Sequence, residues 1–156
     1  MYYSGTQTSL DTTMNEIQIV YTSKATGDVD DVELEEILKT SVRNNAAQNI
    51  SGMLLYTKGS FLQLLEGEVS AVDALIKRIE ADTRHHDIQV LVRTSIKERE
   101  FRNWSMGYHR LNESDAKAMM SFAPFFEDGF DAAKFCEQPG ISLDILRALA
   151  VQLDET

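Results

Sequence analysis

The order of strand-like and helix-like patterns along residues 16–108 is the feature that most narrows the fold. Strands show alternation of apolar and polar side chains or short apolar runs, whereas amphipathic helices repeat apolar residues every three to four positions. In chain order we predict strand, helix, strand, strand, helix, strand and a short further strand, at residues 16–21, 34–42, 50–56, 60–66, 70–79, 88–96 and 104–108.

This order consists of split β-α-β units, which build a two-layer sandwich. The sequence therefore predicts the α+β class, with a ferredoxin-like βαββαβ sandwich in which two helices cover one face of the sheet. Residues 104–108 would add an extra strand. Beyond residue 110 the pattern changes to a helical appendage, with helices predicted at residues 114–120, 125–135 and 142–153.

Local signals set the expected ends of these elements. Asp30 with Glu33, and Ser70 with Asp73, resemble capping pairs at the starts of the two helices. The pair Lys58-Gly59 predicts a tight hairpin turn, because glycine accepts a positive φ. We expect residues 22–31 to be a loop, residues 43–49 to be a polar break after the first helix, and residues 1–14 to be a flexible leader.

Composition excludes several classes of function. The 156 residues carry a formal net charge of −10, which repels phosphate backbones, so we expect no nucleic-acid partner. The single cysteine, Cys136, cannot form an intramolecular disulfide, and the pair His85-His86 has no third ligand at metal-binding spacing, so we expect no metal. No apolar run reaches the length of a membrane span and the N-terminus lacks a secretory pattern, so we expect no membrane partner and a cytoplasmic location.

Two polar side chains stand on strands whose other members are apolar. Gln63 shares a strand face with Phe61 and Leu65, and Tyr21 shares one with Ile17 and Ile19. A buried amide without a partner costs about 1–3 kcal/mol, so Gln63 either faces solvent or meets a polar group inside. The simplest interpretation of each residue alone is an edge glutamine and a core tyrosine with its hydroxyl at the rim.

The remaining polar candidates also have ordinary interpretations. Asn44 and Asn45 follow the first predicted helix and suit a C-cap, although two side-chain amides can also recognise a heterocycle with donors and acceptors. Arg78 and Asp82 lie four residues apart on the second helix, which usually means a solvated ion pair.

In the predicted topology these residues come together. Tyr21 and Gln63 lie on neighbouring strands, and Ile37 and Ile79 lie on the two helices above one face of the sheet. A flat ligand between the helices would have apolar walls on both sides and amides at its edge, which is the general form of a small-molecule site.

Six segments carry a resemblance to a known family, in order and at the right spacing: Ile19-Val-Tyr21-Thr-Ser, Arg43-Asn-Asn45, Ile50-Ser-Gly-Met-Leu-Leu-Tyr56, Phe61-Leu-Gln-Leu-Leu-Glu-Gly67, Arg84-His-His86 and Phe101-Arg-Asn-Trp-Ser-Met106. Together they resemble the BLUF domain, which senses blue light with FAD. The resemblance implies three regions: a leader at 1–14, a BLUF flavin-binding domain at 15–110 and a C-terminal helical cap at 111–156.

The resemblance also implies roles for single residues. Tyr21 matches the donor of an electron and a proton to excited flavin, and Gln63 matches the amide that switches hydrogen bonds beside it. Trp104 and Met106 match the pair on the last strand that exchanges places near Gln63. The resemblance implies cofactor contacts for Tyr21, Ile37, Asn44, Asn45, Gln63, Arg78, Ile79, Asp82 and His85.

We therefore expect a short photoreceptor that binds FAD, or alternatively FMN, and is not an enzyme. Its output would pass through the C-terminal helices to a downstream signalling protein, with homo-oligomers expected. Two other interpretations stay open at this point. One is an acylphosphatase-like enzyme, which residues 22–31 disfavour because they hold no arginine. The other is a flavin-free ferredoxin-like domain that only mediates protein interactions.

Overall fold

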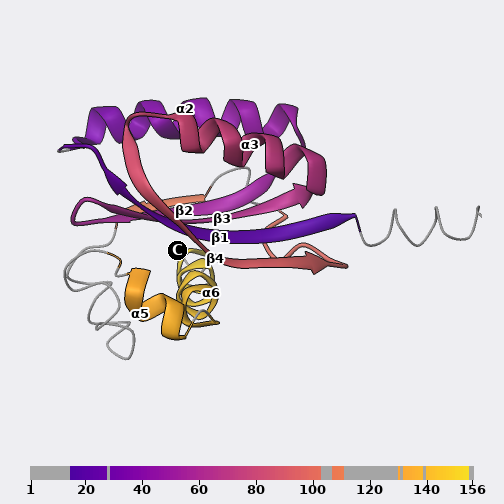
Figure 1. Ribbon diagram of the computed structural model, residues 1–156. Helices are drawn as coiled ribbons and strands as arrows, with labels where there is room; N and C mark the ends of the chain where they lie inside the picture. Colours follow the sequence, from indigo (N-terminus) through magenta and orange to yellow (C-terminus); the bar gives the residue numbers. More distant parts are fainter. Residues whose placement is uncertain are drawn as a thin grey trace, which may run out of the picture.

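The computed structural model describes residues 15–27, 29–102, 107–110, 130, 132–138 and 140–154. Its elements in chain order are β1 (Glu16–Ala25), α2 (Asp31–Ala47), β2 (Ser51–Thr57), β3 (Ser60–Glu68), α3 (Val69–Ala81), β4 (His85–Ile96), β5 (Gly107–Arg110), α5 (Ala132–Glu137) and α6 (Gly140–Asp154). The five strands form one sheet in the order β4-β1-β3-β2-β5 (Figure 1).

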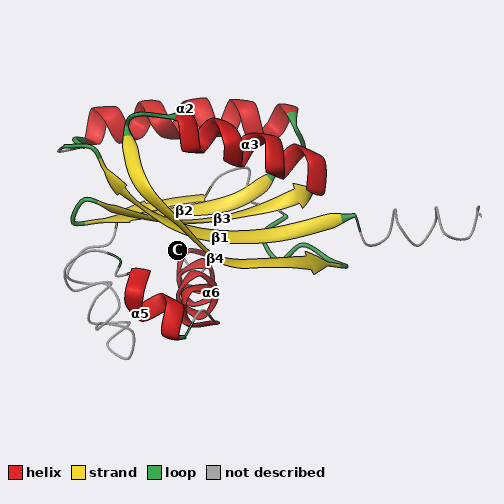
Figure 2. Ribbon diagram, in the orientation of Figure 1, coloured by secondary structure: helices red, strands yellow, loops and turns green. Residues whose placement is uncertain are grey.

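The sheet is covered by helices on both faces. Pairings of β1 with β3 and β4, and of β2 with β3, are antiparallel, whereas β5 runs parallel to β2. Helices α2 and α3 lie over one face, and α5 and α6 lie against the other (Figure 2). The predicted ferredoxin-like sandwich, with an extra strand and C-terminal helices, is therefore confirmed.

Strand alternation divides the interior into two cores. On β1, Ile17, Ile19 and Tyr21 point toward α2 and α3, while Val20 points toward the C-terminal helices. The same division holds on β3, where Leu65 faces the first pair of helices and Leu64 the second. Because successive strand residues point to opposite faces, each central strand supplies both cores.

The second core is as fully buried as the first. Phe135 of α5 and Ile145 and Leu146 of α6 are inaccessible to solvent and pack with Leu62 and Phe101. Burying one such side chain contributes about 1.5–3 kcal/mol, so the C-terminal helices are a substantial part of the fold. Of the predicted C-terminal helices, 142–153 matches α6. The helix predicted at 125–135 overlaps α5 at residues 132–135, whereas residues 114–120 and 125–129 lie outside the described residues.

Two local signals act as expected. The Asp30 side chain accepts a hydrogen bond of 2.8 Å from the backbone N–H of Glu33 and caps α2. Lys58 and Gly59 both take positive φ values, 46° and 78°, which is the backbone of a tight hairpin turn.

Three boundary predictions were wrong. β1 continues to Ala25, so the loop after it begins later than expected. The polar segment 43–49 is not a break, because α2 continues through Ala47 and the left-handed residue that ends the turn is Asn49, with φ of 55°. Ser70 does not cap α3; its hydroxyl donates to the Glu68 carboxylate, and Glu68 is the N-cap, without a side-chain capping bond.

Candidate functional site

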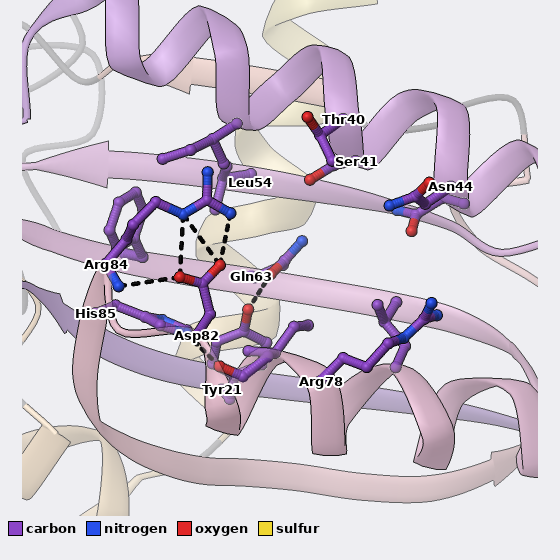
Figure 3. A pocket seen from close by; sticks show the side chains of 15 residues that line it. Tyr21, Thr40, Ser41, Asn44, Leu54, Gln63, Arg78, Asp82, Arg84 and His85 are labelled. Atoms are coloured by element: carbon purple, nitrogen blue, oxygen red, sulfur yellow. Dashed lines mark hydrogen bonds and ion pairs between the residues drawn. The ribbon is translucent and has the colours of Figure 1, made fainter.

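A cavity of about 170 Å3 opens between α2, α3 and the sheet face beneath them, many times the space that one water needs. Figure 3 shows side chains from both helices and from the strands converging on it. Its lining consists of Tyr21, Ile37, Thr40, Ser41, Asn44, Asn45, Leu54, Phe61, Gln63, Leu75, Arg78, Ile79, Asp82, Arg84 and His85.

The floor of the cavity carries a buried polar pair. Tyr21 and Gln63 are register partners on β1 and β3, and the Tyr21 hydroxyl donates a hydrogen bond to Gln63 Oε1. Their exposed fractions are 3% and 6%. With its oxygen turned to Tyr21, Gln63 directs its amide nitrogen away from the phenol, as Figure 3 shows. Gln63 is therefore not an edge residue facing solvent, and the Tyr21 hydroxyl is not at a wet rim.

Burial sets the acidity of this phenol. Loss of hydration, and secondarily the negative charge of Asp82, raise the pKa of Tyr21 well above its ordinary value. The hydroxyl therefore keeps its proton over the physiological range and stays a hydrogen-bond donor toward Gln63.

Asn45 places a second amide inside the cavity. It lies in the last turn of α2 and is 2% exposed, and its backbone carbonyl accepts a 2.8 Å hydrogen bond from Ile50 at the start of β2. Its side-chain nitrogen is buried without a hydrogen-bond partner in the part of the chain that the structure describes. A buried amide nitrogen in this state is costly, so it points to a ligand that supplies an acceptor. Neighbouring Asn44 also lines the cavity, from the exposed side of the helix.

Apolar side chains form the walls. Ile37 of α2 lies on one side, Leu75 and Ile79 of α3 lie on the other, and Leu54 and Phe61 come from the sheet. These surfaces suit a flat ring inserted between the helices, since apolar faces can be buried there while polar edges meet the amides.

Charged groups gather where α3 ends. Asp82 is the C-cap of α3, and Arg84 binds its carboxylate with Nε at 3.0 Å from each oxygen. This contact lowers the pKa of Asp82 and raises that of Arg84. The predicted Arg78–Asp82 pair was wrong, because Asp82 has already left the helix and turns toward Arg84. Arg78 lines the cavity separately.

His85 ties the end of α3 to the sheet. Its Nε2 lies 2.6 Å from the carbonyl oxygen of Ile79 and must donate to it, and its Nδ1 lies 2.9 Å from the hydroxyl of Ser23. Both ring nitrogens are thus engaged by the protein. His85 lines the cavity but acts there through its ring carbons and by holding Ile79, rather than as a free polar ligand.

Every residue expected to contact a cofactor lines this one cavity. Trp104 and Met106 lie outside the described residues. Sequence reasoning missed Thr40, Ser41, Leu54, Phe61, Leu75 and Arg84. Thr40 and Ser41 could have been predicted, because they lie three and four residues after Ile37 and so share its helix face. No sequence pattern identifies Arg84 as the partner of Asp82.

The site chemistry fits a flavin. An unpaired amide donor, a buried phenol–amide pair, apolar walls and two arginines match a flat heterocycle with carbonyl edges and a phosphate-bearing tail. Within the described ranges, no three His, Cys, Asp or Glu side chains lie close enough to hold a metal ion. No described helix is long and apolar enough to cross a membrane.

Comparisons with known proteins agree with this chemistry. The family model "BLUF: Sensors of blue-light using FAD" matches residues 16–107. The β subunit of photoactivated adenylate cyclase from Euglena gracilis is 39% identical over 89 residues, which are 57% of this chain and 10% of that protein. A β-like protein of the same organism is 33% identical over 115 residues, 73% of this chain and 13% of that protein. The chain thus spans about a tenth of the length of these relatives.

Solved structures show the same fold. The dark-state structure of BlrB, described as a BLUF protein, has a TM-score of 0.72 and 26% identity, covering 90% of this chain and 98% of that one. The photo-activated state of BlsA has a TM-score of 0.71 and 29% identity, covering 86% and 94%. A bacterial light-regulated adenylyl cyclase has a TM-score of 0.62 and 36% identity, covering 72% and 36%.

Proposed function

The chain belongs to the BLUF family, sensors of blue light that use FAD, and from this premise we propose how its own residues hold the flavin and respond to light. The flavin is FAD, which lies between α2 and α3 and is bound non-covalently. The observation that carries this proposal is the buried Tyr21–Gln63 hydrogen bond in the floor of a cavity whose other amide, Asn45, has an unpaired nitrogen.

Each part of the cavity has its own task in binding. Asn45, with Asn44 beside it, holds the carbonyl and imide edge of the ring, because an amide offers both a donor and an acceptor. Ile37 and Ile79 cover the two faces of the ring. Arg78 and the Asp82–Arg84 pair meet the polar tail, where guanidinium groups recognise phosphate.

A bound flavin supplies a group that absorbs blue light and becomes a strong oxidant when excited. Tyr21 is placed to release an electron, and the proton on its oxygen lies along the hydrogen bond to Gln63 Oε1. The two ends of the Gln63 amide, the carbonyl and the NH2 group, then exchange roles. The end that faced the phenol comes to face the cavity, and the other end comes to face the phenol. Burial of both residues excludes water from this exchange. Met106 and Trp104 are proposed to exchange places near Gln63.

The output is a change of contacts rather than a catalysed reaction. We assign residues 15–110 to light sensing, residues 111–156 to passing the signal to a downstream protein, and residues 1–14 to a leader. The photoactivated cyclases among the relatives support the proposal that the signal passes to an effector. The packing of α5 and α6 on the sheet supports a route through them. We further propose a cytoplasmic homo-oligomer.

The binding proposal is tested by purifying the protein and extracting its chromophore. We expect a yellow protein with one flavin per chain, released intact by denaturation and identified as FAD by mass. Colourless protein that also fails to bind added FAD or FMN would contradict the proposal. Recovery of FMN alone would correct the cofactor and leave the site in place.

A further inference from the structure

A second buried polar pair joins the same two strands on the opposite face of the sheet. Gln18 on β1 and Glu66 on β3 are register partners, and Gln18 Nε2 donates a 2.9 Å hydrogen bond to Glu66 Oε2. Each partner lies three residues along its strand from Tyr21 or Gln63, and an odd offset reverses the face. The central strands thus carry one polar pair toward the flavin cavity and one toward the C-terminal helices.

Glu66 also holds the chain that follows β4. The backbone N–H of Glu100 donates to its Oε2 at 3.0 Å, and that of Phe101 donates to its Oε1 at 2.7 Å. Glu66 is inaccessible to solvent, so all three of these donors meet it in a dry environment. A buried network of this kind fixes geometry strongly, because each donor loses its partner if the carboxylate moves.

Residues 100–101, which Glu66 binds, are in contact with the C-terminal helices. The Arg147 guanidinium of α6 binds the Glu100 carboxylate with contacts of 2.7 and 2.6 Å, and this contact is the main cause of the lowered pKa of Glu100. The Phe101 ring is 2% exposed and packs in one core with Phe135 of α5 and Leu146 of α6. One ionic and one apolar contact therefore bind residues 100–101 to the cap.

We propose that Glu66 is the positioning residue that couples β1 and β3 to the C-terminal helices, so that a shift of these strands at Tyr21 and Gln63 reaches α6 through Glu100 and Phe101. The inference rests on the proposed function for its stimulus. Hydrogen bonds weaken steeply with distance and angle, so a small displacement of β3 relative to β1 changes both polar pairs. The two pairs share strands, which gives the coupling a contiguous physical path.

The test compares hydrogen exchange of α5 and α6 in the dark and under blue light, with the flavin absorbance recorded in the same samples. Glu66→Gln keeps the shape of the side chain but replaces one acceptor oxygen with an NH2 group. That NH2 group would face hydrogen-bond donors that now bind the carboxylate. Arg147→Met breaks only the half-exposed link to Glu100 and guards against a folding failure of the first variant. Arg93→Met is the matched control, because Arg93 forms a similar half-exposed two-contact pair with Asp73 on the flavin side.

We expect the parent protein and Arg93→Met to show a light-dependent change of exchange in residues 140–148. Glu66→Gln and Arg147→Met should keep the absorbance shift but lose most of that change, and Glu66→Gln should raise dark exchange of the Glu100 and Phe101 amides about tenfold. The charge swap Glu100→Arg with Arg147→Glu should restore the response.

Two results overturn the coupling role. One is a light-dependent change of hydrogen exchange in residues 140–148 that is as large as in the parent protein, both in Arg147→Met and in Glu66→Gln if that variant folds. The other is loss of the absorbance shift itself in either variant, which would place the residue in the light reaction. An absorbance shift missing from the parent protein would instead remove the proposed function on which the inference rests.

Discussion

The Tyr21 hydroxyl donates a hydrogen bond to the side-chain carbonyl of Gln63, its register partner on the neighbouring antiparallel strand. The bond fixes which end of the amide faces the phenol, and it does so beneath a cavity enclosed by α2 and α3. A phenol next to an amide with two unlike ends is the pair that the proposed light-driven switch requires beside the flavin, and that switch needs no substrate.

Tyr21→Phe should bind flavin but lose the light-induced red shift of its absorption, because phenylalanine keeps the packing and removes the proton donor. The measurement is a light-minus-dark spectrum of the purified variant. Tyr56→Phe is the matched control, since Tyr56 is equally buried on the same side of the sheet but does not line the cavity. A normal red shift in Tyr21→Phe would show that the phenol has been given the wrong role.

Gln63→Leu should also retain flavin and lose the red shift, because leucine has no donor or acceptor to exchange. The same spectrum measures it, with Gln89→Leu on the exposed face of β4 as the control. Removing the amide also leaves the buried Tyr21 hydroxyl without its acceptor, so we expect the variant to be less stable by about 1–3 kcal/mol in urea unfolding. A photocycle like that of the parent would exclude Gln63 as the switching group.

Asn45→Ala should weaken flavin binding by about tenfold to a hundredfold, because each lost hydrogen bond to a buried polar edge costs about 1–3 kcal/mol. Titration of flavin into stripped protein gives the affinity. Gln48→Ala, an exposed substitution at the end of the same helix, serves as the control and should bind as the parent does. Equal affinities for Asn45→Ala and the parent would mean that the unpaired amide does not contact the ligand.

The raised pKa of Tyr21 predicts a loss of stability in alkaline solution. The folded protein holds the phenolic proton more tightly than the unfolded chain, whose ordinary pKa is 10.0. The contribution is therefore complete below pH 10 and declines as pH rises toward the folded-state pKa. Between pH 7 and pH 11 the parent should lose about 1 kcal/mol more unfolding free energy than Tyr21→Phe, as measured by urea unfolding of both. Equal losses would show that the phenol is accessible to solvent.

Pattern reasoning reached the fold because the order of elements is strongly marked. Alternation on β1 places Ile17, Ile19 and Tyr21 on one face, and the Lys58-Gly59 turn fixes the β2–β3 register that brings Gln63 opposite Leu54. Once β1 pairs with β3, the Tyr21–Gln63 contact follows from register alone. The resemblance, not the pattern, identified which polar residues belong to the site.

The failures of sequence reasoning have separate physical causes. Residues 43–45 look polar, yet they remain helical because α2 packs only one side on the sheet, so Asn45 can be buried while Arg43 and Asn44 stay exposed. Spacing predicted Arg78 as the partner of Asp82, but the chain leaves the helix at Asp82 and turns its carboxylate to Arg84. The Gln18–Glu66 pair was missed because no local signal distinguishes two buried polar side chains from solvent-facing ones on half-buried strands.

If Tyr21 and Gln63 switch hydrogen bonds around a flavin, a single light-minus-dark absorption spectrum of the purified, flavin-loaded protein will show it. We expect a small red shift of the flavin band under blue light that reverses in the dark, with no bleaching from a lasting covalent adduct. A flavin-loaded protein whose spectrum is unchanged by blue light, or bleaches without a red shift, would contradict it.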